Sequence, residues 1–107
     1  MGTTKAEIFT DEQNELANLA KALAHPARIA IVQELSKLNS CVCGELVTEI
    51  GLAQSTISQH LSELKKEGLI TGETEGVRTC YCLDSKKWQQ AFSSLSTFLS
   101  GVKSSCC

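Results

Sequence analysis

The chain has 107 residues and a formal net charge of −2, from 10 lysines and arginines against 12 aspartates and glutamates. This length suits one domain, and no apolar run is long enough to span a membrane. The polar, acidic segment 1–13 lacks the basic and then apolar pattern of a signal peptide, so we expect a cytoplasmic protein. The net charge counts mildly against a nucleic-acid partner, although the distribution of charge matters more than its sum.

Two helices are expected in the first part of the chain. Thr10 and Gln13 have the spacing of a capping box, which predicts a helix at about residues 11–24. A second helix starts at Pro26, a residue that is acceptable at a first helical position. The apolar residues that recur on one face of the first helix are Leu16, Leu19, Ala20 and Leu23. The core face expected for the second helix is Ile29, Val32 and Leu35, with Leu38 beyond.

A helix-turn-helix is expected at about residues 44–67. Its first, short helix ends at Gly51, and its second helix is closed by Gly68 in a left-handed conformation. The apolar face of the second helix is Ile57, Leu61 and Leu64. Short polar side chains near its start can reach base edges or phosphates: Gln54, Ser55, Thr56, Ser58, Gln59 and His60. The alternative is an ordinary solvated helix face, with His60 packing or capping internally.

The hydrophobic period changes after residue 68. Residues 69–83 alternate as in strands, with Glu75 and Gly76 in the middle, which predicts a hairpin. After a helix-turn-helix, such a hairpin is a wing, with Arg78 near its tip to contact a backbone phosphate. The expected fold class is therefore mainly α with a small antiparallel β-hairpin: one homodimeric winged helix-turn-helix domain over residues 1–107.

A last helix is expected at about residues 85–102, capped by Asp84 or Ser85. Its apolar residues recur at intervals of four and three, as in a seam between helices: Trp88, Phe92, Leu95, Leu99 and Val102. We interpret the helices at 11–24 and 85–102 as a homodimer interface. The alternative is that both pack only on the core of their own domain.

The six cysteines form three close pairs: Cys41 and Cys43, Cys80 and Cys82, and Cys106 and Cys107. Because cytosolic thiols stay reduced, they are interpreted as metal ligands or redox sensors before structural disulfides. Extended chain at 40–42 would pair with the strand at 78–83, whose two cysteines share a face, so three or four sulfurs could meet. Four thiolates suit zinc or cadmium, and three suit As(III) or Sb(III).

Each of the two later pairs has an alternative interpretation. Cys80 and Cys82 could serve as small hydrophobic residues of a strand. Cys106 and Cys107 could form a chelating tail that reaches the first pair across a dimer, or a frayed terminus without a role.

Three stretches, "LAKALAHPARIAIVQEL", "CVCGEL" and "QSTISQHLSELKKEGLI", resemble the ArsR/SmtB family of metalloregulatory repressors over about residues 14–88. The resemblance implies a homodimeric winged helix-turn-helix repressor. Such a protein binds a dyad-symmetric DNA operator when ligand-free and releases it when a thiophilic metal or metalloid binds. The resemblance also marks Cys41 and Cys43 as ligands, although Leu46 stands where the arsenic sensors carry a third cysteine.

Other departures from the family pattern affect DNA binding and zinc sensing. Ala53 stands where Ser or Thr often caps the recognition helix. Glu73 and Glu75 make the wing less basic, so operator affinity is expected to be modest and salt dependent. The carboxylate and histidine pairs of a zinc site are absent from 85–107, which argues against zinc sensing there.

The predicted function is a repressor released by As(III), with Sb(III), cadmium or zinc as alternative ligands. The second interpretation is a redox-responsive or persulfide-responsive repressor of the same fold. A thiol enzyme needs a cysteine with a histidine base. His25 and His60 are the only histidines, and neither is near a cysteine in sequence, so we predict that the protein is not an enzyme.

Overall fold

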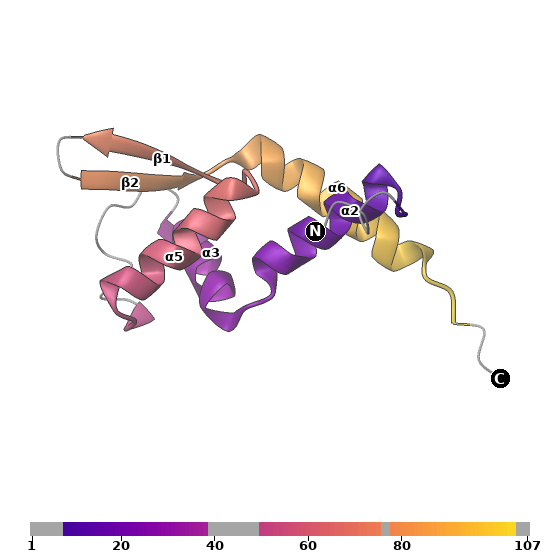
Figure 1. Cartoon of the computed structure of the whole chain (residues 1–107), viewed down its shortest axis with the longest axis horizontal. Helices are drawn as coiled ribbons and strands as arrows, with labels where there is room; N and C mark the ends of the chain where they lie inside the picture. Colours follow the sequence, from indigo (N-terminus) through magenta and orange to yellow (C-terminus); the bar gives the residue numbers. More distant parts are fainter. Residues whose placement is uncertain (1–7, 39–49, 76–77, 105–107) are drawn as a thin grey trace.

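The computed structural model describes residues 8–38, 50–75 and 78–104, which form an elongated body of 53 × 34 × 25 Å. The helices and strands follow one another from the amino to the carboxyl end as drawn in Figure 1. They are α2 (Asp11–Leu23), α3 (Pro26–Leu38), α5 (Gln54–Lys66), β1 (Ile70–Glu75), β2 (Arg78–Leu83) and α6 (Ser85–Gly101). The short helix expected to open the helix-turn-helix, before residue 50, lies outside the described residues.

Local capping signals set the start of α2 as the sequence predicts. The Thr10 hydroxyl accepts a hydrogen bond from the Gln13 backbone N–H at 3.0 Å, and the Gln13 side chain accepts one from the Thr10 N–H at 2.9 Å. Asp11 and Glu12 occupy the first turn, where carboxylates favour the helix dipole. The expected capping box is therefore confirmed.

The buried faces of the first two helices differ from the expected ones. In α2 the buried residues include Ala22, whereas Ala20 is exposed. In α3 the chain buries Ala27 and Ile31, whereas Ile29 is 41% exposed. Residues two apart on a helix point in nearly opposite directions, so only one of these two sets can face the core. The expectation that Ile29 lies on the core face of the second helix was therefore wrong.

The core gathers around the expected apolar face of α5. Ile57, Leu61 and Leu64 are all buried, as predicted, and pack with α3 and with the chain that leaves the helix. That chain reverses at Gly68, whose φ of +83° is a backbone conformation that glycine adopts without strain. Leu69 and Ile70, directly after the turn, are also completely or nearly completely buried.

β1 and β2 form the predicted antiparallel hairpin, in a register from Ile70 opposite Leu83 to Glu75 opposite Arg78. Tyr81 and Leu83 pack against the core. Successive side chains of a strand point to opposite faces, so Cys80 and Cys82 share the face that points away from this core. Arg78 lies at the end of the hairpin farthest from α6, as expected.

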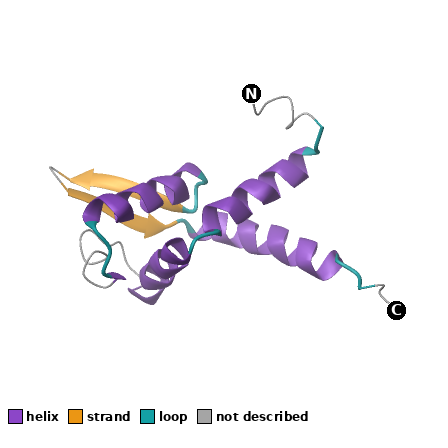
Figure 2. Ribbon diagram, turned by 60° about the horizontal axis from the view of Figure 1, so that its bottom comes forward, coloured by secondary structure: helices purple, strands orange, loops and turns teal. Residues whose placement is uncertain are grey.

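The last helix is joined to the core at its first turn and then leaves it. The Asp84 carboxylate caps α6 by accepting from the Lys87 N–H at 3.1 Å. The Leu69 carbonyl accepts from both the Trp88 indole at 2.8 Å and the Asp84 N–H at 3.1 Å. Figure 2 shows α2 and α6 diverging from the core like the arms of a V.

Apolar side chains remain uncovered along and beside these two arms. On α6 only Ala91 is buried, whereas Phe92 is 74% exposed. The other large exposed apolar residues at this end are Ile8, Phe9, Phe98, Leu99 and Val102. Among the described helices, none combines the length and apolarity that crossing a bilayer requires.

Candidate nucleic-acid interface

The polar face of α5 lies opposite the side by which the helix packs on the core. Gln54, Ser55, Ser58 and Gln59 are all exposed there. Ala53 occupies the N-cap position with an extended backbone and makes no side-chain capping hydrogen bond. The first turn of α5 therefore presents amide N–H groups beside short polar side chains, a surface that suits contacts with base edges and phosphates.

Thr56 and His60 differ from the other predicted contact residues because both are half-buried. The His60 Nδ1 atom accepts a hydrogen bond from Arg28 Nε at 3.1 Å, so this side chain packs internally. Burial lowers the pKa of His60 below its ordinary value of 6.5, and the charges of His25 and Arg28 lower it further. The "HPAR" stretch, which contains Arg28, was the only sign of this contact in the sequence, and it does not indicate His60 as the partner.

The wing lies next to α5 and places basic groups around its base and tip. Arg78 opens β2 directly opposite Glu75, which sets its backbone at the end of the hairpin. The Lys65 ammonium of α5 reaches over β1 beside Gly72. Lys66 forms an exposed ion pair with Glu63 at 3.5 Å. Basic side chains of α5 therefore lie beside the wing, close to β1.

The two cysteines of the wing form disulfide bonds. Cys80 and Cys82 are both half-buried, and both are disulfide-bonded. The remaining predicted ligands, Cys41, Cys43, Cys106 and Cys107, lie outside the described residues. Within the described ranges, no group of three or more His, Cys, Asp or Glu side chains is arranged to hold a metal ion.

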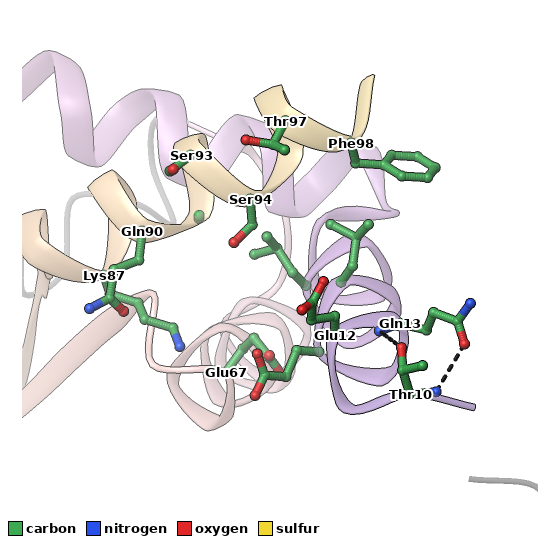
Figure 3. A pocket seen from close by; sticks show the side chains of 14 residues that line it. Thr10, Glu12, Gln13, Glu67, Lys87, Gln90, Ser93, Ser94, Thr97 and Phe98 are labelled. Atoms are coloured by element: carbon green, nitrogen blue, oxygen red, sulfur yellow. Dashed lines mark hydrogen bonds between the residues drawn. The ribbon is translucent and has the colours of Figure 1, made fainter. Parts of the chain in front are cut away.

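A groove of about 660 Å³ runs between α2 and α6 (Figure 3). Its floor is partly apolar, with Leu16, Leu19 and Ala91 among the lining residues. Glu12 and Glu67 border one side, and small hydroxyl side chains of α6 border the other. The groove thus continues the uncovered apolar surface of the two arms.

A helix with an exposed polar face, followed by a two-stranded hairpin and flanked by outer helices, defines a winged helix-turn-helix protein. Residues 25–71 match the model of the bacterial regulatory protein arsR family. The chain is also 37% identical, over 91 residues, to the biofilm growth-associated repressor of Xylella fastidiosa, across 85% of this chain and 79% of that protein. The chain belongs to the ArsR family.

Two further comparisons agree with this assignment. The transcriptional repressor SmtB of Mycobacterium tuberculosis is 46% identical over 65 residues, which are 61% of this chain and 47% of that protein. The chain thus aligns with about half the length of that relative. HlyU from Vibrio cholerae N16961 superposes with a TM-score of 0.66 and 28% identity, covering 85% of this chain and 97% of that chain. The family consists of regulatory proteins, in agreement with the prediction that the chain is not an enzyme.

Proposed function

We propose that the protein is a transcriptional repressor that inserts α5 into the major groove of a dyad-symmetric operator and lays its wing along the flanking backbone. The observation that carries this proposal is the exposed row Gln54, Ser55, Ser58 and Gln59 on a helix whose other face is locked into the core. Amide and hydroxyl groups of this length donate to and accept from base edges. Arg78 at the wing tip supplies a phosphate contact.

The repressor acts as a homodimer through α2 and α6. Phe92, Phe98 and Leu99 are more than half exposed on α6, and the groove between the two arms has an apolar floor. A second copy of this chain suits this surface, because a two-fold axis sets two α5 helices one helical turn of DNA apart.

The inducing ligand is a thiophilic ion, As(III) first, with Sb(III), cadmium and zinc as alternatives. Cys80 and Cys82 support this choice because they share one face of β2 and are each bonded to another sulfur, so sulfur atoms converge at this strand. When reduced, the two residues offer two thiolates. As(III) requires three thiolates: Cys41 and Cys43 supply two of them, and Cys80 and Cys82 or Cys106 and Cys107 supply the third.

Binding at this strand would act on the DNA-reading unit through the backbone. β2 ends at Leu83, and the next residue, Asp84, donates to the carbonyl of Leu69, which lies between α5 and β1 and itself donates to the Leu64 carbonyl of α5. A ligand that draws β2 toward other thiols therefore re-aims the wing and α5 relative to the dimer axis. Because two half-sites must be matched at once, a small rotation loses one of them, and a preference of about 1–3 kcal/mol for the released state suffices to shift binding.

The second candidate is a redox-responsive or persulfide-responsive repressor of the same fold. The disulfide-bonded state of Cys80 and Cys82 favours it, because oxidation itself would then join the sulfurs. HlyU from Vibrio cholerae, a structural relative with a TM-score of 0.63 and 25% identity over 95% of this chain, has been solved in a form described as reduced.

DNA recognition by α5 is tested by selecting duplexes of about 30 base pairs, long enough for two half-sites, from a random library with wild-type protein. The enriched duplex is then used in fluorescence anisotropy with Gln54→Ala and with the control Gln89→Ala, an exposed glutamine on α6. We expect binding to weaken about tenfold for Gln54→Ala and to stay unchanged for the control. Absence of any enriched sequence, or equal binding by the two variants, would contradict the proposal.

The ligand set is tested by arsenic-edge X-ray absorption on reduced protein loaded with As(III). We expect three sulfur neighbours, and fewer when Cys80 and Cys82 are replaced by serine. If that variant still shows three sulfur neighbours, the ligands are instead Cys41 and Cys43 with Cys106 or Cys107. If As(III) does not bind, and an added mild oxidant that accepts two electrons per disulfide lowers the mass of the protein by two hydrogen atoms per disulfide, the redox candidate is favoured.

A further inference from the structure

Arg28 joins three helices at one corner of the molecule. From α3, its Nη1 donates to the carbonyls of Lys21 and Ala22 in the last turn of α2, both at 3.2 Å. Its Nε donates to Nδ1 of His60 in the middle of α5 at 3.1 Å. One rigid, planar guanidinium therefore ties a proposed dimerisation helix to the proposed recognition helix.

Two imidazoles complete this corner. His25, in the turn between α2 and α3, accepts from the Ala27 N–H through Nδ1 at 3.0 Å and so caps α3. The centres of the His25 and His60 rings are 4.4 Å apart, with the rings tilted by 50°. Each ring uses the lone pair on Nδ1 as an acceptor, so each carries its proton on Nε2 in this arrangement.

We propose that Arg28 is a positioning residue for DNA binding, which fixes the direction of α5 relative to α2 through His60, and that operator affinity therefore falls as His60 gains a proton. The inference rests on the proposed DNA-binding function. It adds a residue that does not touch DNA and a dependence on pH that the thiol ligands do not provide.

The chemistry of the contact sets the direction of the effect. A protonated imidazole has no acceptor at Nδ1, and it would place a second cation 3.1 Å from the Arg28 guanidinium. Burial, His25 and Arg28 already lower the pKa of His60, which shows that these surroundings favour the neutral ring. Protonation therefore breaks the connection between α2 and α5 and leaves α5 free to tilt.

The charges around His60 come from several elements. His25 in the turn and Arg28 on α3 act on it directly. From α2, the backbone carbonyls of Lys21 and Ala22 accept from the same Arg28 guanidinium. On α5 itself, Glu63 is the nearest carboxylate in sequence, and it is paired with Lys66 at 3.5 Å.

The test uses full-length wild-type protein and the duplex that it selects. Anisotropy gives the dissociation constant from about pH 7.5 down to about pH 5.5, the range in which histidine changes charge. The main variant is His60→Asn, because the Asn Oδ1 atom takes the place of Nδ1 and cannot be protonated in this range, while helix propensity is nearly the same. His25→Asn is the matched control, because asparagine is a good N-cap for α3.

We expect wild-type affinity to fall about two- to fivefold over this range, because the lowered pKa of His60 leaves its protonation incomplete at the acid end, whereas His60→Asn stays nearly constant and matches wild type at the upper pH. His25→Asn should keep the wild-type fall. Arg28→Lys retains the charge but not the forked geometry, so it should bind about three- to tenfold more weakly at the upper pH and show a flat profile. Circular dichroism at each pH verifies folding, and if Arg28→Lys does not fold, the two histidine variants decide.

Four results would overturn the inference: a wild-type profile without an acid fall, tighter binding in acid, a fall that persists in His60→Asn, or one that disappears in His25→Asn. Tighter binding in acid would show that protonated His60 contacts a phosphate. These results leave the DNA-binding function in place. Failure of wild-type protein to enrich any duplex removes that function and the inference with it.

Discussion

A single half-buried imidazole, His60, makes the stability of this fold depend on pH. Its pKa is lowered in the folded protein by burial, by His25 and by Arg28, whereas in the unfolded chain it returns to about 6.5. The folded state therefore holds this proton more weakly than the unfolded state does. Its contribution to stability is complete above 6.5 and is lost as the pH falls through the lower, folded value.

Urea unfolding tests this contribution directly. The free energy of unfolding of wild type and of His60→Asn should differ by a constant amount above pH 6.5, and the wild type should lose more stability below it. Parallel curves down to about pH 5 would show that His60 does not titrate between the two states.

At the scale of elements, the Leu69 carbonyl joins the turn that follows α5 to the start of α6. Trp88→Phe keeps the aromatic packing but removes the indole hydrogen bond of 2.8 Å, while the Asp84 N–H still satisfies the carbonyl. We expect a loss of about 1 kcal/mol in the free energy of unfolding, against no measurable loss for Gln89→Ala on the exposed face of α6. Equal stability of both variants would show that the junction does not need this bond.

The helices also show which features the sequence could predict: their starts could be predicted, but not every buried face. The starts of α2 and α3 follow Thr10 and Pro26 as predicted, because these signals act within a few residues, and Asp84 is the one of the two predicted caps that α6 uses. The apolar face of α5 was also correct, because its pattern is unambiguous. Ile29 was misplaced because α3 offers two apolar faces, and only packing against α5 decides between them.

Contacts between distant segments were beyond the reach of sequence patterns. Arg28 and His60 are 32 positions apart, and neither residue type at its position predicts a hydrogen bond with the other. The exposed row on α5 was foreseen from composition, but half-burial of Thr56 and His60 depends on how α5 docks on its neighbours. Local rules therefore predicted the exposed polar face of α5, and the tertiary arrangement showed what holds this helix in place.

For the whole molecule, the diverging arms α2 and α6 predict assembly into a dimer (Figure 2). Phe92→Ser and Leu99→Ser remove side chains that are 74% and 65% exposed in the single chain. Each should raise the dimer dissociation constant about tenfold or more, because burial of a large apolar side chain contributes about 1.5–3 kcal/mol.

Sedimentation equilibrium measures this assembly at micromolar concentration. The control is Ile29→Ser, which removes an apolar side chain that is 41% exposed and belongs to α3 instead of to either arm. A monomeric wild type, or equal weakening by the control, would contradict the proposed interface.

If thiol chemistry on the wing controls DNA binding by α5, as we propose, titration of the protein–DNA complex with As(III) under reducing conditions tests this control most directly. Anisotropy of the selected duplex should fall to the free value for wild type. For Cys80→Ser with Cys82→Ser, and for Cys41→Ser with Cys43→Ser, DNA binding should persist and release should be lost or strongly weakened. Unchanged release from both double variants would contradict the account.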